Sequence, residues 1–111
     1  MPQFIQQLIH DVQHMEEQYK KAKAGELFDF YEIVKPFTDV VDQHIAVLKS
    51  YEPHILALPY MNKMKFDILV SNIEELSVEC HFKRTSRKLF TEKLKAVHYD
   101  LSYIQDNGVN L

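Results

Sequence analysis

The sequence predicts an all-α fold: a single domain over residues 1–111, built as an antiparallel up-and-down four-helix bundle. Apolar residues recur at intervals of three and four along four separate stretches, which is the period of one helix face. The 111 residues contain only two glycines, and this scarcity disfavours a turn-rich β fold. Short connections separate the four stretches, so consecutive helices pack most simply as antiparallel neighbours around one core.

The first helix is expected over residues 2–24. Gly25 can adopt the positive φ that closes a helix, and the lysines that precede it favour the negative end of the helix dipole. The apolar face of this helix consists of Phe4, Leu8, Val12, Met15, Tyr19 and Ala22.

The second apolar stripe keeps its helical phase through a proline. Pro36 removes a backbone donor and disfavours helical geometry at the residue before it. We therefore expect a helix that is kinked or broken near Pro36, and the unbroken phase favours the kink. The stripe consists of Phe30, Val34, Phe37, Val41, Ile45 and Leu48.

Two further helices follow a connection over residues 52–59, which contains two prolines. The third helix is expected over residues 60–82, with Phe66, Leu69, Ile73, Leu76 and Cys80 on its buried face. Thr85 or Ser86 should cap the fourth helix, and Asn107 with Gly108 should end it. The buried face of the fourth helix consists of Phe90, Leu94, Val97, Leu101 and Ile104.

The composition bounds the function classes. A net charge of -3 gives no general attraction to nucleic acid. No stretch approaches the roughly 18 apolar residues that cross a bilayer, so neither a membrane span nor a signal peptide is expected. The single cysteine, Cys80, fits a reducing compartment. We expect a cytoplasmic protein that is a monomer or a weak homodimer.

No catalytic motif is present, and we predict neither catalytic residues nor a cofactor. His10 and His14 have a spacing that suits a metal, but they project away from the apolar stripe and lack a third ligand. Inward-facing polar residues are expected to form hydrogen bonds at helix seams; they are His44, Asn72, Glu79 and His98. The alternative is a metal-dependent enzyme whose site in the bundle core combines His44, Glu79 and His98.

The turn before the fourth helix is basic, with Lys83 and Arg84 ahead of the cap. Basic side chains beside the positive end of a helix dipole are unfavourable. We therefore hypothesise an anion site, in place of a simple solvated loop, formed by Thr85, Ser86, Arg87 and Lys88.

Apolar side chains off the main stripes of the last two helices indicate a partner surface if they are exposed. They are Val78, Phe82, Tyr99 and Tyr103. The leading hypothesis is a non-enzymatic interaction or accessory protein that uses the outer faces of these helices and their basic turn.

From residue 28 to about residue 103 the chain resembles the YppE-like family, small uncharacterised proteins of Gram-positive bacteria. The resemblance depends on DFY at 29–31, VKP at 34–36, NIEEL at 72–76 and CHFKRTSRKLF at 80–90. It implies an up-and-down four-helix bundle with no established activity, substrate or cofactor.

Overall fold

The computed structural model describes residues 3–108. All regular structure in this range is helical, as the sequence predicts, and no strand occurs in it. The elements are α1 (Gln3–Lys23), the π-helix η1 (Phe30–Val34), α2 (Lys35–Ser50), α3 (Glu52–Leu56), α4 (Lys63–Glu79) and α5 (Arg87–Asn107). No helix among these residues is both long enough and apolar enough to cross a membrane.

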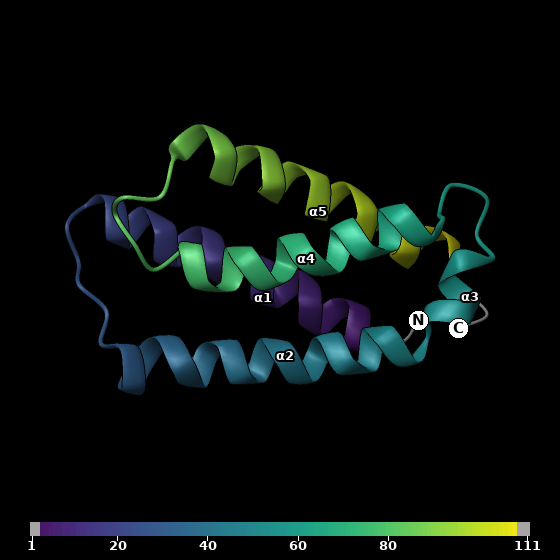
Figure 1. Cartoon of the computed structure of the whole chain (residues 1–111), viewed down its shortest axis with the longest axis horizontal. Coiled ribbons are helices and arrows are strands. Elements are labelled where there is room, and N and C mark those ends of the chain that lie inside the picture. Colours follow the sequence, from purple (N-terminus) through teal and green to yellow (C-terminus); the bar gives the residue numbers. More distant parts are fainter. Residues whose placement is uncertain (1–2, 109–111) are drawn as a thin grey trace.

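The four long helices lie side by side in an elongated molecule of 43 × 26 × 20 Å (Figure 1). Helix α1 contacts α2, α4 and α5, and α4 also contacts α2 and α5. At one end, the last turn of α1 lies near the connection between α4 and α5 (Figure 1). At the other end, α3 contacts α2 and α4.

The hydrophobic core lies between the four long helices, and the predicted stripes supply most of it. Every stripe residue of α1, α4 and α5 is buried. In the second stripe Val34, Val41, Ile45 and Leu48 are buried, but Phe30 is 52% exposed. The prediction that Phe30 joins the core is therefore wrong.

Near Pro36 the π-helix η1 passes directly into α2, with no residue between them. The N–H groups of Val34 and Lys35 donate to the carbonyls of Asp29 and Phe30, five residues back, which is the π pattern. Helix α2 then starts at Lys35 with Pro36 in its first turn, where a missing N–H does no harm. The helix therefore changes from π to α hydrogen bonding beside Pro36, and a kink at this point stays a prediction.

The helix ends follow local capping chemistry. Ser86 caps α5 as predicted, since its hydroxyl accepts the Leu89 N–H, and Gly25 adopts a φ of 105° after α1. Helix α4 is shorter than the predicted range of 60–82, because Asn62 caps it and it ends at Glu79. The predicted connection over 52–59 contains α3, whose Ile55 is buried. The predicted start of the first helix at Pro2 lies outside the described residues.

Candidate functional site

Helix α1 holds the basic turn between α4 and α5 in a fixed position. The Tyr19 hydroxyl donates to the Thr85 carbonyl over 2.7 Å, and Lys23 Nζ donates to the Lys83 carbonyl over 2.8 Å. The Tyr19 ring also stacks on Phe90, with 4.0 Å between the ring centroids. The turn is therefore tied to α1 at two carbonyls, and its conformation depends on the bundle rather than on the turn alone.

A hollow of about 390 Å³ opens beside this turn, and we call it the turn groove. Its lining consists of Val78, Glu79, Phe82, Arg84, Thr85, Ser86, Leu89 and Lys93. Val78 and Leu89 are 42% and 56% exposed, so the groove presents apolar surface to solvent. Lys93 donates to Glu79 over 2.9 Å, and this ion pair neutralises the one carboxylate of the lining.

Four cations lie on the turn and at the start of α5 without a counter-charge, and Arg84 among them lines the turn groove. Lys83, Arg84, Arg87 and Lys88 are exposed, and within residues 3–108 none of them forms an ion pair. The Arg84 guanidinium lies 4.9 Å from the centroid of the Phe82 ring, which is a cation–π distance. The groove therefore combines an apolar wall with an unneutralised positive rim.

The two hydroxyl residues of the hypothesised anion site are engaged within the turn. Thr85 donates its hydroxyl to the Glu79 carbonyl and its N–H to the Phe82 carbonyl. Ser86 uses its hydroxyl to cap α5. The N–H groups of Arg87 and Lys88, in the first turn of α5, are the donors that a helix leaves without intrahelical partners.

The four residues of the predicted partner surface do not lie together. Val78 and Phe82 line the turn groove, whereas Tyr99 and Tyr103 line a second hollow further along α5. Sequence reasoning missed Leu89, the most exposed apolar side chain of the turn groove. Leu89, Ala96 and Tyr103 follow one another at intervals of seven residues, and this spacing would have placed Leu89 on the same outer face of the helix as the other two.

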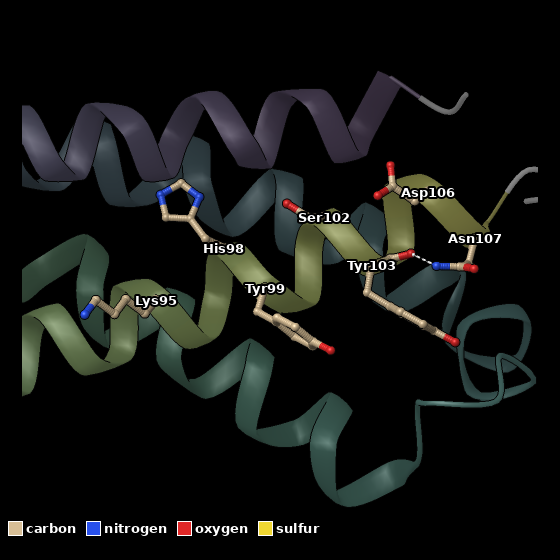
Figure 2. Close-up of a pocket in the computed structure, with 7 residues that line it drawn as sticks. All are labelled: Lys95, His98, Tyr99, Ser102, Tyr103, Asp106 and Asn107. Atoms are coloured by element: carbon tan, nitrogen blue, oxygen red, sulfur yellow. Dashed lines mark hydrogen bonds between the residues drawn. The ribbon is translucent and has the colours of Figure 1, made fainter.

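The second hollow has a volume of about 570 Å³, and we call it the α5 hollow. Its lining consists of Lys95, His98, Tyr99, Ser102, Tyr103, Asp106 and Asn107. Figure 2 shows Tyr99 and Tyr103 projecting on one side of α5, and His98, Ser102 and Asp106 on the other. The hollow is therefore a shallow depression along the outer face of a single helix.

The loop before α4 supports the tyrosine side of the α5 hollow. The Tyr60 N–H donates to the Tyr103 hydroxyl over 3.0 Å, and the Tyr60 hydroxyl donates to Asp100 over 3.1 Å. Burial raises the pKa of Asp100, and the hydrogen bond from Tyr60 opposes that rise. The same burial, together with the negative charge of Asp100, raises the pKa of Tyr60. This cluster fixes Tyr103 against the loop.

Two of the four predicted inward polar residues are paired at helix seams. His44 of α2 contacts Asp11 of α1, with 2.5 Å between Nδ1 and Oδ2, and Glu79 pairs with Lys93 across α4 and α5. His98 instead lines the α5 hollow. Burial raises the pKa of Asp11, while the hydrogen bond and charge of His44 act in the opposite direction. Asp11 as the partner of His44 was missed, since the two residues lie far apart in sequence.

The structure does not assemble the metal site of the alternative hypothesis. Within residues 3–108 no group of three or more His, Cys, Asp or Glu side chains is placed to hold a metal ion. His44, Glu79 and His98 therefore do not converge in the core, because each occupies a different seam or surface. Asn72 is half-buried, and His10 and His14 are exposed, as expected for the two histidines.

Cys80 is fully buried, which confirms its predicted place in the core. Its Sγ lies 3.3 Å from Nδ1 of His81, and burial raises the pKa of the thiol to about 12. His81 is also buried, between the edges of Phe28 and Phe37, and burial lowers its pKa. Because the thiolate is the reactive form, this pair is not an activated nucleophile.

This geometry defines a small all-α protein that carries the turn groove and the α5 hollow on the outer surface of its last helices. The chain belongs to a bacterial family described as a domain of unknown function, DUF1798, whose model matches residues 5–107. None of the curated proteins compared with it matches significantly.

Two solved structures resemble the chain. A DUF1798 protein of unknown function from Staphylococcus aureus subsp. aureus is 48% identical, covers 94% of this chain and 91% of its own, and has a TM-score of 0.91. A protein of unknown function from Listeria innocua has a TM-score of 0.79 at 21% identity, covering 93% of this chain and 86% of its own. The second likeness concerns the fold alone.

Proposed function

We propose that this chain is a non-enzymatic interaction protein whose turn groove binds an acidic segment of a partner protein. The observation that carries the proposal is the combination of exposed Val78 and Leu89 with four unpaired cations on one preformed turn. Apolar contact supplies binding free energy, and complementary charge supplies orientation and association rate.

The two halves of the groove define the partner's chemistry. A large apolar side chain of the partner would lie against Val78, Phe82 and Leu89. Carboxylates beside that side chain would meet the Arg84 and Arg87 guanidiniums, which bind carboxylates in a bidentate manner. The N–H groups of Arg87 and Lys88 would add donors at the positive end of the α5 dipole. In this proposal Arg87 and Lys88 hold the anion, and Thr85 and Ser86 shape the turn.

A titration of the isotope-labelled chain with a short acidic peptide that contains a central phenylalanine tests the proposal. We expect saturable chemical-shift changes at Val78, Phe82 and Leu89. Replacing the phenylalanine by glycine should weaken binding, because the apolar wall loses its contact. Arg84→Glu and Arg87→Glu should each weaken it further, whereas Lys49→Glu, an equal charge change on α2, should not.

Two results would contradict the proposal. One is the absence of saturable shifts at the turn groove with the phenylalanine peptide. The other is equal binding by the wild type and the Arg87→Glu variant, which would remove charge complementarity from the account. A peptide with lysines in place of the acidic residues provides the matched ligand control.

Three finer interpretations accompany this proposal. We classify the fold as an antiparallel up-and-down four-helix bundle, supported by the side-by-side packing of α1, α2, α4 and α5. We equate the YppE-like group with the DUF1798 family, since both descriptions concern bacterial proteins of unknown function. We also propose a cytoplasmic location, supported by the single buried thiol. A metal-dependent activity has no assembled ligand set in its favour among residues 3–108.

A further inference from the structure

The outer face of α5 carries a charge pattern that the turn groove does not use. The residues of the α5 hollow recur at intervals of three and four from Lys95 to Asp106, and they lie opposite the buried stripe of the same helix. Lys95 stands at one end of this face and Asp106 at the other. Between them the face carries aromatic, hydroxyl and imidazole side chains (Figure 2).

Neither charge at the ends of this face is neutralised within the chain. Lys95 and Asp106 are both exposed, and neither forms an ion pair with any residue between 3 and 108. Their Cα atoms are separated by 11 positions, the difference between 106 and 95. At ~1.5 Å per residue this spans roughly 16 Å of helix, or about three turns.

We infer that this face binds a second copy of the same chain, with the two α5 helices antiparallel and Lys95 of each copy beside Asp106 of the other. The two-fold axis lies midway between the two α5 helices, level with the peptide between Asp100 and Leu101. With the axis at that level, two residues whose numbers add to 201, such as Lys95 and Asp106, stand at the same height along the paired helices. Such a contact is isologous, so every favourable pair occurs twice.

The remaining residues of the face match under the same symmetry. The two-fold axis keeps each side of the face on its own side, so the side with Tyr99 and Tyr103 meets the same side of the other copy, ring against ring (Figure 2). The side with His98 and Ser102 likewise meets its own counterpart (Figure 2). A parallel arrangement would instead place Lys95 beside Lys95 and Asp106 beside Asp106, and this repulsion selects the antiparallel orientation.

The size of the face sets the strength of the dimer. The α5 hollow is lined by seven residues, well below the roughly 20–30 residues per side of a standard stable interface. The charge pairs lie at an exposed rim, where salt screens them. The dimer should therefore be weak, should form at high protein concentration and should weaken as ionic strength rises.

Sedimentation equilibrium of the whole chain over a concentration series tests the inference through a charge-reversal cycle. Lys95→Glu and Asp106→Lys should each weaken self-association about tenfold, because two exposed pairs are replaced by two repulsive ones. An equimolar mixture of the two variants should associate as well as the wild type, since each mixed dimer regains both opposite-charge pairs. Circular dichroism of each variant provides the check on folding.

Matched controls lie on α2, where Lys49→Glu and Asp42→Lys make the same charge changes at exposed positions. These variants should associate as the wild type does. A wild type that stays monomeric at every accessible concentration would overturn the inference. Dimerisation that is unaffected by charge reversal at Lys95 and Asp106, or a mixture that fails to recover it, would also overturn it. None of these outcomes bears on peptide binding at the turn groove.

Discussion

Replacing Tyr19 by phenylalanine tests whether α1 holds the basic turn in place. The change keeps the ring that stacks on Phe90 and removes only the hydroxyl that donates to the Thr85 carbonyl. That hydrogen bond is partly buried, and a net contribution of about 1 kcal/mol to the free energy of unfolding is typical. For a domain of this size the melting temperature should fall by about 4 °C.

Equilibrium urea unfolding followed by circular dichroism measures this change, with the slope m expected to stay constant. Tyr19→Ala, which also deletes a ring that is 6% exposed, should cost about 3–5 kcal/mol. Tyr99→Phe is the matched control, because Tyr99 is 62% exposed, and it should leave stability unchanged.

Amide hydrogen exchange locates the effect. In Tyr19→Phe the amides of residues 83–88 should exchange faster than in the wild type, while those of α2 should be unchanged. Unchanged stability together with unchanged exchange at the turn would refute the argument that Tyr19 preforms the turn groove.

Three further predictions follow from burial and charge. Cys80 should react slowly with an aqueous disulfide reagent until the chain unfolds, because its thiol is buried with a pKa of about 12; rapid labelling of the native protein would show that α4 is rotated. The pKa of Asp11 is raised above 3.8, so its contribution to stability is fully present below pH 3.8 and is lost as pH rises through the folded-state pKa. Asp11→Asn should remove this pH dependence. Because asparagine keeps a hydrogen bond to His44, the variant should be at least as stable as the wild type at neutral pH. A clear loss of stability at neutral pH in a denaturant titration would contradict the raised pKa of Asp11. Finally, sulfate and phosphate should raise the melting temperature more than chloride at equal ionic strength, and Arg87→Glu should abolish the difference. Identical melting curves in the three salts would show that no anion binds at Arg87 and Lys88.

Helix periodicity identified most of the fold because the buried faces of α1, α4 and α5 repeat without interruption. It failed where the backbone departs from the α period. A π-turn takes more residues than an α-turn, so the four-residue spacing from Phe30 to Val34 no longer places both side chains on one face. Helix α3 was missed because Pro53 serves as the start of a helix as readily as its end.

The candidate site depended on contacts that one sequence does not reveal. The basic turn and its cap at Ser86 are local, and the sequence located them. The ties from Tyr19 and Lys23 to that turn join residues sixty or more positions apart, and they follow only from the packing of α1 against the end of α4 and the start of α5. Tyr99 and Tyr103 lie away from the turn groove because they come about three turns or more after Leu89 on α5. His44 pairs with Asp11 and Glu79 with Lys93, each across a different helix seam.

Site-specific photocrosslinking in living cells tests the central claim most directly. A photoreactive amino acid in place of Leu89 lies in the turn groove, and one in place of Val47, also exposed, lies on α2. The account predicts one discrete crosslinked protein from position 89 that is absent from position 47 and is lost when Arg84 and Arg87 are changed to glutamate. The same pattern of crosslinks from both positions, or crosslinks at position 89 that survive both charge reversals, would contradict it.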